Sequence, residues 1–331
     1  MPREISVSEI AKELNISATT VSRALSGKGR VGEETKEKIL QYIGEHDYVP
    51  HVRPEGYAQK DTRNICVTLP GENDFAELPY FHQIMLSIED YFGSHDYNII
   101  PVKCKATDIS LLQKVIQKHK ADGVILTRTI ENGIDIRYLQ EQGVPFVVVG
   151  SYDDDSVYQV DVDQQNGCRE LTNILLRKGL RKIALFCADA THIVTQSRYR
   201  GFLEACQEND LAVNKKYVFD EVGYPEVAAR ALEDCLKDQI ECIICMDDNI
   251  CVNVLNRLRA ENVAVPRDIR IASYYNSSLL DIYYPPITAL EFNTKELGRV
   301  ASKMLYDLLC NKEPVRKQKL GYQVILKEST K

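Results

Sequence analysis

Residues 17–30 combine small hydroxyl and methyl side chains with isolated basic ones. Thr and Ala side chains can contact thymine methyl groups in the major groove of DNA, and Arg can bind guanine or phosphate. Three basic residues and no acidic one lie between Ser17 and Gly32, so positive potential is concentrated there. This pattern predicts a DNA-contacting surface. The residues expected to form it are Ser17, Ala18, Thr19, Thr20, Ser22, Arg23, Lys28 and Arg30.

Three short helices would position this surface. Apolar spacing predicts a first helix with an inward face of Val7, Ile10, Ala11 and Leu14, capped by Ser6. Ser17 is the expected N-cap of a second helix, whose inward residues are Val21, Ala24 and Leu25. A third helix is expected over 33–46. The result is a helix-turn-helix head, although a three-helix domain of this shape can also bind a protein partner or nothing.

A second group of residues has the types that bind a polar small molecule. The Arg198 guanidinium can hold two adjacent oxygens at once, and Asp247 and Asp248 follow an apolar run directly, where carboxylates can accept hydrogen bonds from hydroxyls. The alternatives are a surface arginine on a helix and, for Asp248, a helix cap. Aromatic rings that could stack on a sugar or on a planar ligand are Phe75, Tyr80, Phe81, Tyr152 and Tyr224.

From Asn64 onward, apolar runs alternate with amphipathic helices, the pattern of parallel βαβ units. The expected strands are 65–69, 97–102, 123–126, 146–149, 159–162, 182–186, 217–219, 242–245 and 269–273. The expected helices are about 80–93, 110–119, 135–142, 164–179, 197–209, 225–237, 248–262 and 293–311. We expect a body of two doubly wound parallel-sheet lobes that bind a ligand beyond the carboxyl ends of their strands.

Composition limits the class of protein further. The 331 residues suit a small head plus a bilobed body, and the net charge of −7 argues against nonspecific coating of nucleic acid. No apolar run approaches the length of a membrane span, and no secretory signal is seen, so we expect a cytoplasmic protein. The ten cysteines, including Cys242 and Cys245, fit buried apolar positions. No catalytic, metal or cofactor motif is present in the sequence, so an enzyme is not expected.

The string EIAKELNISATTVSRALSGKGRVGEETKEKI, followed by YVP, resembles the DNA-binding head of the lactose/galactose repressor family. The resemblance implies that Ala18 and Thr19 choose the operator sequence, while Thr20, Ser22 and Arg23 contact phosphates and bases. Arg30 falls where the family often has another groove contact. The implied DNA-binding domain is 1–47.

The linker, 48–63, departs from the family pattern. In most members this place holds a hinge helix that inserts a leucine into the minor groove on operator binding. Here Pro54 and Gly56 oppose a stable helix, and Tyr57 stands at the position of the leucine. The sequence leaves open whether this linker enters the groove.

The body, 64–331, also resembles the family and periplasmic sugar-binding proteins, through ADGVIL, GVPFVVVG, VDVDQQNG, SRYRGF and YPPITAL among other segments. The resemblance implies an N-lobe of about 64–160 and 291–320 and a C-lobe of about 161–290 and 321–331. Arg198 matches the effector-binding arginine, and Asp247 replaces a usual Asn. Tyr275 replaces a sugar-binding Asp, for which Asn276 could substitute, and Gly150 replaces another. Phe81 and Tyr224 hold pocket positions, with lobe core as the alternative.

The resemblance implies a homodimeric transcription regulator, most often a repressor, that binds a pseudo-palindromic operator under the control of a small-molecule effector. A carbohydrate is the expected effector, with galactose or a galactoside favoured by the altered linker and the YYPPITAL segment. A purine or other corepressor is the second choice of ligand. The other classes are a sugar-processing enzyme and a ligand-binding protein whose head no longer binds DNA. Gly321 to Lys331 are expected to form a strand and a short tail without heptads, which favours a dimer over a tetramer.

Overall fold

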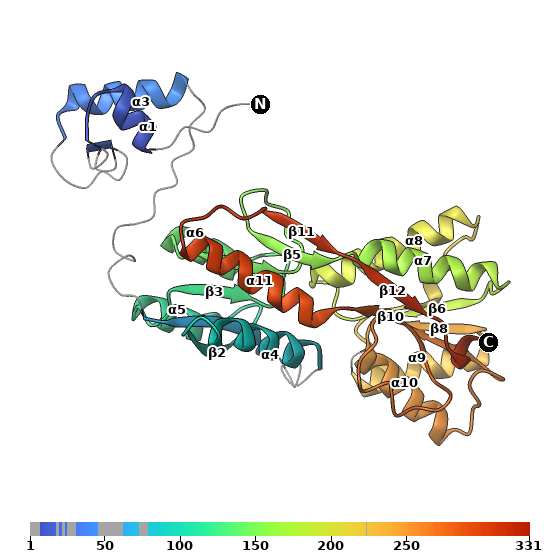
Figure 1. Ribbon diagram of the computed structural model, residues 1–331. Helices are drawn as coiled ribbons and strands as arrows, with labels where there is room; N and C mark the ends of the chain where they lie inside the picture. The colour runs from blue at the N-terminus through green and yellow to red at the C-terminus, as the bar shows by residue number, and fades with distance from the viewer. Residues whose placement is uncertain are drawn as a thin grey trace. The chain divides into compact units, whose positions relative to one another are not determined.

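The structure is a computed structural model that describes residues 7–17, 20–21, 24, 31–45, 62–72, 79–222 and 224–331 (Figure 1). The chain divides into two compact units, one of residues 1–61 with Tyr138–Val144 and one of Thr62–Arg137 with Pro145–Lys331. We call residues 1–61 the head and the residues from Thr62 onward the body. Of the residues expected to bind DNA or effector, eight lie outside the described part. They are Ala18, Thr19, Ser22, Arg23, Lys28, Arg30, Tyr57 and Phe75.

The head is built around one small apolar core. Helix α1 covers Val7–Glu13 and helix α3 covers Glu33–Glu45, and Thr20, Val21 and Ala24 between them are also helical. Ile10, Val21 and Ile39 are fully buried, and Ala11 and Ala24 complete the core. These are the inward positions that the helical spacing predicts. A three-helix packing of the described residues therefore follows from the sequence pattern.

The first lobe of the body, the N-lobe, contains a parallel sheet with helices packed against it. Its strand order is β2 (Asn98–Cys104), β1 (Asn64–Pro70), β3 (Gly123–Leu126), β4 (Phe146–Val149), β5 (Gln159–Val162) and β11 (Lys317–Leu320). Its helices are α4 (Pro79–Gly93), α5 (Ser110–Gln117), α6 (Ile134–Gln142) and α11 (Thr294–Leu309). Strand β3 is buried along its whole length, as a central parallel strand covered on both faces should be.

The second lobe, the C-lobe, repeats the plan. Its strand order is β7 (Val218–Phe219), β6 (Ile183–Phe186), β8 (Cys242–Cys245), β9 (Arg270–Ser273), β10 (Thr288–Phe292) and β12 (Tyr322–Ile325). All neighbours are parallel except β10 and β12. Its helices are α7 (Gln164–Arg177), α8 (Ile193–Glu208), α9 (Pro225–Lys237) and α10 (Asp248–Ala260). Short 3₁₀ turns cover Lys215–Tyr217 and Glu328–Thr330.

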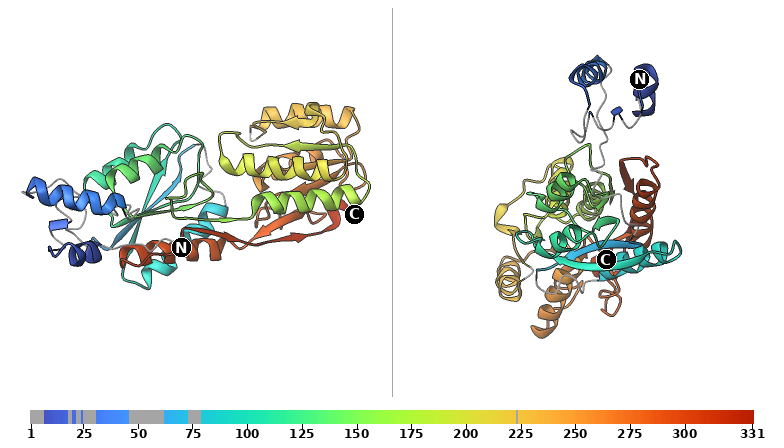
Figure 2. Two further views of the ribbon diagram at one scale, coloured as in Figure 1. Left: turned by 90° about the horizontal axis from the view of Figure 1, so that it is seen from above. Right: turned by 90° about the vertical axis from the view of Figure 1, so that its left-hand side faces the viewer.

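The chain passes between the lobes three times, and the left-hand view in Figure 2 shows the two lobes side by side with chain running between them. The first two coincide with helix caps. Asp163 follows β5 and caps α7, and Asn293 follows β10 and caps α11. At the third, Gly321 alone separates β11 of the N-lobe sheet from β12 of the C-lobe sheet. Each passage thus joins regular elements with almost no loop.

The predicted elements agree with the observed ones within a few residues, with three exceptions. Helix α8 begins at Ile193, four residues before the expected start at 197. Strands β10 and β11 were not among the expected strands. All ten cysteines are free, and all except Cys310 are buried, so their apolar segments do place them in the core. Within the described residues, no helix is long and apolar enough to span a membrane, and no group of side chains fits a metal ion.

Candidate functional site

In the head, the structure describes Ser17 and Thr20 of the predicted DNA-contacting residues. The backbone N–H of Thr20 donates a hydrogen bond to Ser17 Oγ at 3.1 Å, which is the geometry of an N-cap. The two side-chain hydroxyls lie 2.8 Å apart and also form a hydrogen bond. The expected cap at Ser17 is therefore confirmed. It marks the start of the helical segment that contains Thr20, Val21 and Ala24.

Replacing Ser17 with Ala should loosen this helix. The substitution removes the acceptor for the Thr20 N–H and should cost about 1 kcal/mol of local stability, which corresponds to roughly fivefold faster amide exchange at Thr20 and Val21. Hydrogen exchange on the full-length protein would measure it. Ser17→Asp, which keeps a capping acceptor, is the matched control and should restore slow exchange. Equal exchange in all three proteins would contradict the capping role.

In the body, the polar residues of interest follow the carboxyl ends of strands at two topological switch points. In the N-lobe, β1 and β3 are neighbours, and Glu72 and Arg128 come after them. In the C-lobe, β6 and β8 are neighbours, and helix α8 and residue Asp247 come after them. Ligands of open α/β sheets bind at such positions, because the chain leaves the two strands in opposite directions and opens a crevice. The fold thus places these polar residues where ligands of such sheets bind.

Arg198 lies at the centre of this junction. It projects from α8 and is only 8% exposed. Its Nε donates to Gln164 Oε1 at 3.0 Å, and Nη1 donates to the carbonyl oxygen of Met246, so α7, α8 and the end of β8 hold one guanidinium. The alternative of a surface arginine is therefore wrong.

The two acids after β8 have different roles. Asp247 caps α10, since its Oδ1 accepts the Ile250 N–H at 2.8 Å. Asp248 is the first residue of α10 and accepts hydrogen bonds from Ser277 Oγ and from the Asn249 N–H. The alternative that Asp248 is the cap is corrected: Asp247 fills that position. Burial and the neighbouring Asp248 charge raise the pKa of Asp247 to about 6.

Residues of the N-lobe complete this group. Asp161 in β5 accepts hydrogen bonds from Ser151 Oγ and from the Val162 N–H, both at 2.7 Å. Burial raises the pKa of Asp161, whereas the Arg198 charge acts to lower it. Burial and the Asp161 charge raise the pKa of the Tyr80 hydroxyl on α4. We call Tyr80, Asp161, Arg198, Asp247, Asp248 and Tyr275 the interlobe cluster.

Aromatic rings connect the lobes within this cluster. The rings of Tyr80 and Tyr275 meet edge to face, with centroids 5.6 Å apart. Phe81 lies edge to face with Tyr80 at 5.1 Å, and Phe292 stacks on Tyr275 at 6.3 Å. Tyr275 is buried at 4% exposure, which places a ring where the resemblance leads one to expect a sugar-binding carboxylate. The cluster therefore combines carboxylates with stacked aromatic faces.

The remaining predicted effector residues differ in their surroundings. Asn276 follows Tyr275, and its Oδ1 is buried without a hydrogen-bond partner among the described residues. Such an atom is costly unless a ligand or water donates to it. Tyr224, at the N-cap position of α9, is 54% exposed, so the lobe-core alternative is wrong for it.

Sequence reasoning missed a second contact between the lobes, centred on Arg128. This side chain binds both carboxylate oxygens of Glu72, at 3.0 and 2.7 Å, and donates to the Cys104 carbonyl at 2.8 Å. It also donates to His192 Nε2 of the C-lobe at 3.4 Å, next to a backbone hydrogen bond from Glu131 to Thr191. Arg128 follows the buried strand β3 almost directly, the same signal that singled out Asp247.

Family models match both the head and the body of the chain. Residues 6–51 match the model of bacterial regulatory proteins of the lacI family, and residues 172–330 match a periplasmic binding protein-like domain. The HTH-type transcriptional regulator RegA of Clostridium saccharobutylicum is 27% identical over 335 residues, which cover 98% of this chain and 99% of RegA.

Two solved structures have the same fold. The complex of the transcriptional regulator CelR with cellobiose has a TM-score of 0.74 at 22% identity and covers 98% of this chain and 100% of that one. The lac repressor dimer bound to operator and the anti-inducer ONPF has a TM-score of 0.69 at 17% identity, with 99% of both chains covered.

A helix-turn-helix head joined to two lobes of the periplasmic-binding-protein type defines a DNA-binding transcriptional regulator. The chain thus combines a head of the lacI family of bacterial regulatory proteins with a periplasmic-binding-protein-like body, and its similarity to the regulator RegA extends over nearly its whole length.

Proposed function

We propose that the protein is an effector-controlled repressor of the cytoplasm, a homodimer whose two heads bind the half-sites of a pseudo-palindromic operator. A carbohydrate bound at the interlobe cluster changes operator affinity by altering how the lobes pack. The observation that carries this proposal is Arg198. It is buried among polar partners at the strand ends, where a guanidinium serves a polar ligand, and its charge acts on carboxylates from both lobes.

The operator arm of the proposal can be tested with DNA selected from a randomised library by the full-length protein. Arg23→Ala should weaken binding to the selected site by roughly 1–3 kcal/mol, since Arg23 is expected to contact bases or phosphates. Fluorescence anisotropy at fixed salt would measure the change. Unchanged affinity would remove Arg23 from the interface.

A test of the proposed effector site requires variants that still fold. Arg198→Lys keeps the positive charge but lacks the planar fork that binds two acceptors at once. It should abolish the effect of added sugar on operator binding and leave operator binding itself intact. Arg200→Lys is the matched control, because Arg200 lies two residues away on α8 and is exposed. A normal sugar response in Arg198→Lys would overturn the effector site.

The dimer has a candidate surface in the turn before β10. Ile282 and Tyr284 are 84% and 93% exposed there, although both are large and apolar. Tyr283 between them anchors the turn to α10 through a 2.8 Å hydrogen bond from its hydroxyl to Asn256. Exposed apolar side chains on an anchored turn favour burial against a second subunit.

A charge at this surface should separate the subunits. Tyr284→Asp should convert the dimer to a monomer in light scattering at micromolar concentration and weaken operator binding at least tenfold, because one head alone contacts only a half-site. Val315→Asp, which alters another exposed apolar side chain at 68% exposure, should stay dimeric. A dimeric Tyr284→Asp protein would exclude this surface.

A further inference from the structure

The interlobe cluster and the adjacent Asn276 offer a ligand several acceptors. Asp161 and Asp247 each accept hydrogen bonds from their own lobe, yet both keep some surface open to solvent. The buried Oδ1 of Asn276 is an acceptor without a donor in the described chain. On the donor side, Arg198 already gives hydrogen bonds to Gln164 and Met246. A ligand that satisfies this site must be rich in N–H or O–H donors.

The charges around Arg198 are also unbalanced. The Arg198 charge acts to lower the pKa of the carboxylates of Asp161, Asp247 and Asp248. The other described cation near Asp161 is Lys319, which lies 3.6 Å from the carboxylate of Asp163. Two cations thus stand against four carboxylates, an excess of two negative charges. A phosphorylated sugar or another anion would be repelled here, whereas a cation would be attracted.

Aromatic faces complete an environment that suits an ammonium group. Tyr80 and Tyr275 bring their rings together at the junction, and Phe292 stacks on Tyr275. Aromatic rings attract cations through their negative faces and also pack on the apolar face of a sugar ring. Carboxylates and aromatic rings together are the surroundings that an amine on a sugar would require.

We propose that the effector is a cationic amino sugar, whose ammonium group binds among Asp247, Asp161 and the tyrosine rings while its hydroxyls engage Arg198 and Asn276. This inference rests on the proposed function and narrows its ligand class. A neutral hexose would leave the excess negative charge uncompensated at the junction. The carboxylate of Asp247 then selects for the amine.

The test uses matched sets of sugars that differ at one group. Galactosamine, galactose and N-acetylgalactosamine form one set, and glucosamine, glucose and N-acetylglucosamine the other, with hypoxanthine and galactose 6-phosphate as further probes. Binding to the full-length protein is measured by calorimetry at pH 7, where the amines carry positive charge. One amine should bind at least tenfold more tightly than its neutral partners, and this preference should shrink as salt is raised.

Two substitutions test whether the charge of Asp247 binds the amine. Asp247→Asn keeps a capping side chain but removes the charge, and it should weaken amine binding at least tenfold while changing neutral-sugar binding less than threefold. Asp210→Asn removes an equal charge from an exposed position after the far end of α8. Its amine affinity should match that of the unchanged protein.

The outcomes separate the inference from the proposed function. Tighter binding of an amine, lost in Asp247→Asn alone, supports the amino-sugar effector. If a neutral sugar or hypoxanthine binds at least as tightly as every amine, or if no amine binds, the inference is overturned. In that case operator binding that still responds to the bound probe leaves the proposed function standing. Operator affinity that stays the same with a bound probe overturns the proposed function itself.

Discussion

Gly201→Ala should destabilise the body by about 3 kcal/mol. A Cβ atom at this position would lie 2.2 Å from the backbone oxygen of Gln165 and 3.0 Å from Cys168 Cβ. Because the first of these neighbours is backbone, α7 and α8 must move apart to accept the methyl group. Gly201 is therefore what allows the two helices to pack so closely.

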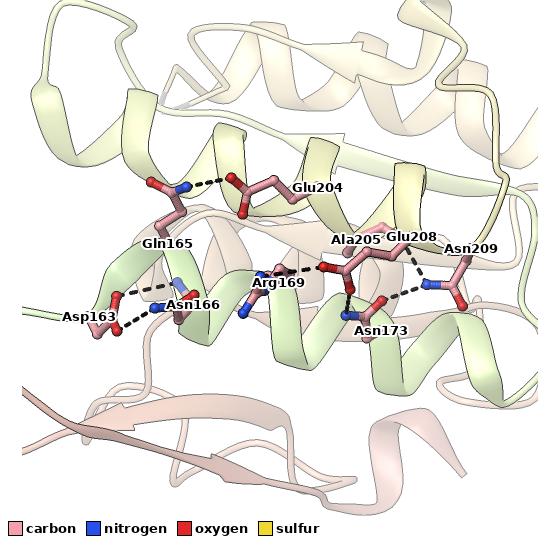
Figure 3. Close-up of polar contacts among 9 residues, drawn as sticks. All are labelled: Asp163, Gln165, Asn166, Arg169, Asn173, Glu204, Ala205, Glu208 and Asn209. Carbon is pink, nitrogen blue, oxygen red and sulfur yellow. Dashed lines mark hydrogen bonds and ion pairs between the residues drawn. The ribbon is translucent and has the colours of Figure 1, made fainter.

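The separation of these helices would break a row of polar contacts (Figure 3). Gln165 donates to Glu204 at 2.6 Å, and Asn173 donates to Glu208 at 2.7 Å, so each pair joins α7 to α8. At the other end of the row, Asn209 after α8 donates to Asn173 at 2.5 Å. These bonds are short-range and cannot stretch by more than a few tenths of an ångström without being lost.

The same movement should reach the candidate effector site. Arg198 precedes Gly201 by one helical turn on α8, and its Nε binds Gln164, the first residue of α7. Displacing α8 from α7 lengthens that bond and shifts the guanidinium away from the strand ends. Gly201→Ala should therefore weaken the effector response as well as stability. The position of Arg198 therefore depends on the close helix packing that Gly201 allows three residues later.

Urea unfolding followed by circular dichroism would measure the loss of stability. The matched control is Gly93→Ala at the end of α4, where an added Cβ meets no atom within 4 Å. That change should be neutral or slightly stabilising, because alanine favours a helix by up to about 1 kcal/mol. If both variants unfold at the same urea concentration as the unchanged protein, close packing at Gly201 is not required.

The sequence was sufficient for the fold class because its apolar runs and amphipathic segments alternate clearly. Strands such as β3 and β8 are short, apolar and completely buried, which makes them easy to find. Strand β11 was missed for a physical reason. Its residues Lys317–Leu320 alternate between exposed and partly buried, and both lysines are polar, so no apolar run marks it. Its pairing with β5 is a tertiary effect that local sequence does not encode.

The interlobe cluster was only partly predictable from sequence. Arg198 and Asp247 follow from motif and strand-end position, and the structure brings them together with Tyr80 and Tyr275. Asp161 was not among the predicted site residues, because a single acid in an apolar strand usually lies on the solvent-exposed face of that strand. Its proximity to Arg198 depends on the passage of the chain between lobes.

The contact between Arg128 and His192 joins residues 64 positions apart in different lobes. Such a pair depends on how the lobes meet, which neither periodicity nor spacing reveals. The signal available was the position of Arg128 directly beyond a buried strand. Arg128 and Asp247 both follow the carboxyl ends of central strands, the edge at which doubly wound folds bind ligands.

Asp247→Asn should make the protein more stable at neutral pH, by between about 2 and 3 kcal/mol. The folded-state pKa of Asp247 is about 6, raised by burial and by the Asp248 charge from its ordinary value of 3.8. Ionising this group is thus harder in the folded state than in the unfolded state. Its favourable contribution is complete below pH 4 and is lost as pH rises through 6. Asparagine avoids that loss and still caps α10.

The free energy of unfolding should be compared at pH 4 and pH 7.5 by urea titration. The advantage of Asp247→Asn should be near zero at pH 4 and reach its full size at pH 7.5, because only then is Asp247 ionised in the folded protein. Asp210→Asn, at an exposed position in the same lobe, should show no comparable pH dependence. An advantage that is equal at both pH values would mean that Asp247 is not held at an elevated pKa. A charge that lowers the stability of the ligand-free protein is expected at a site for a cationic ligand, because binding of that ligand stabilises the folded state.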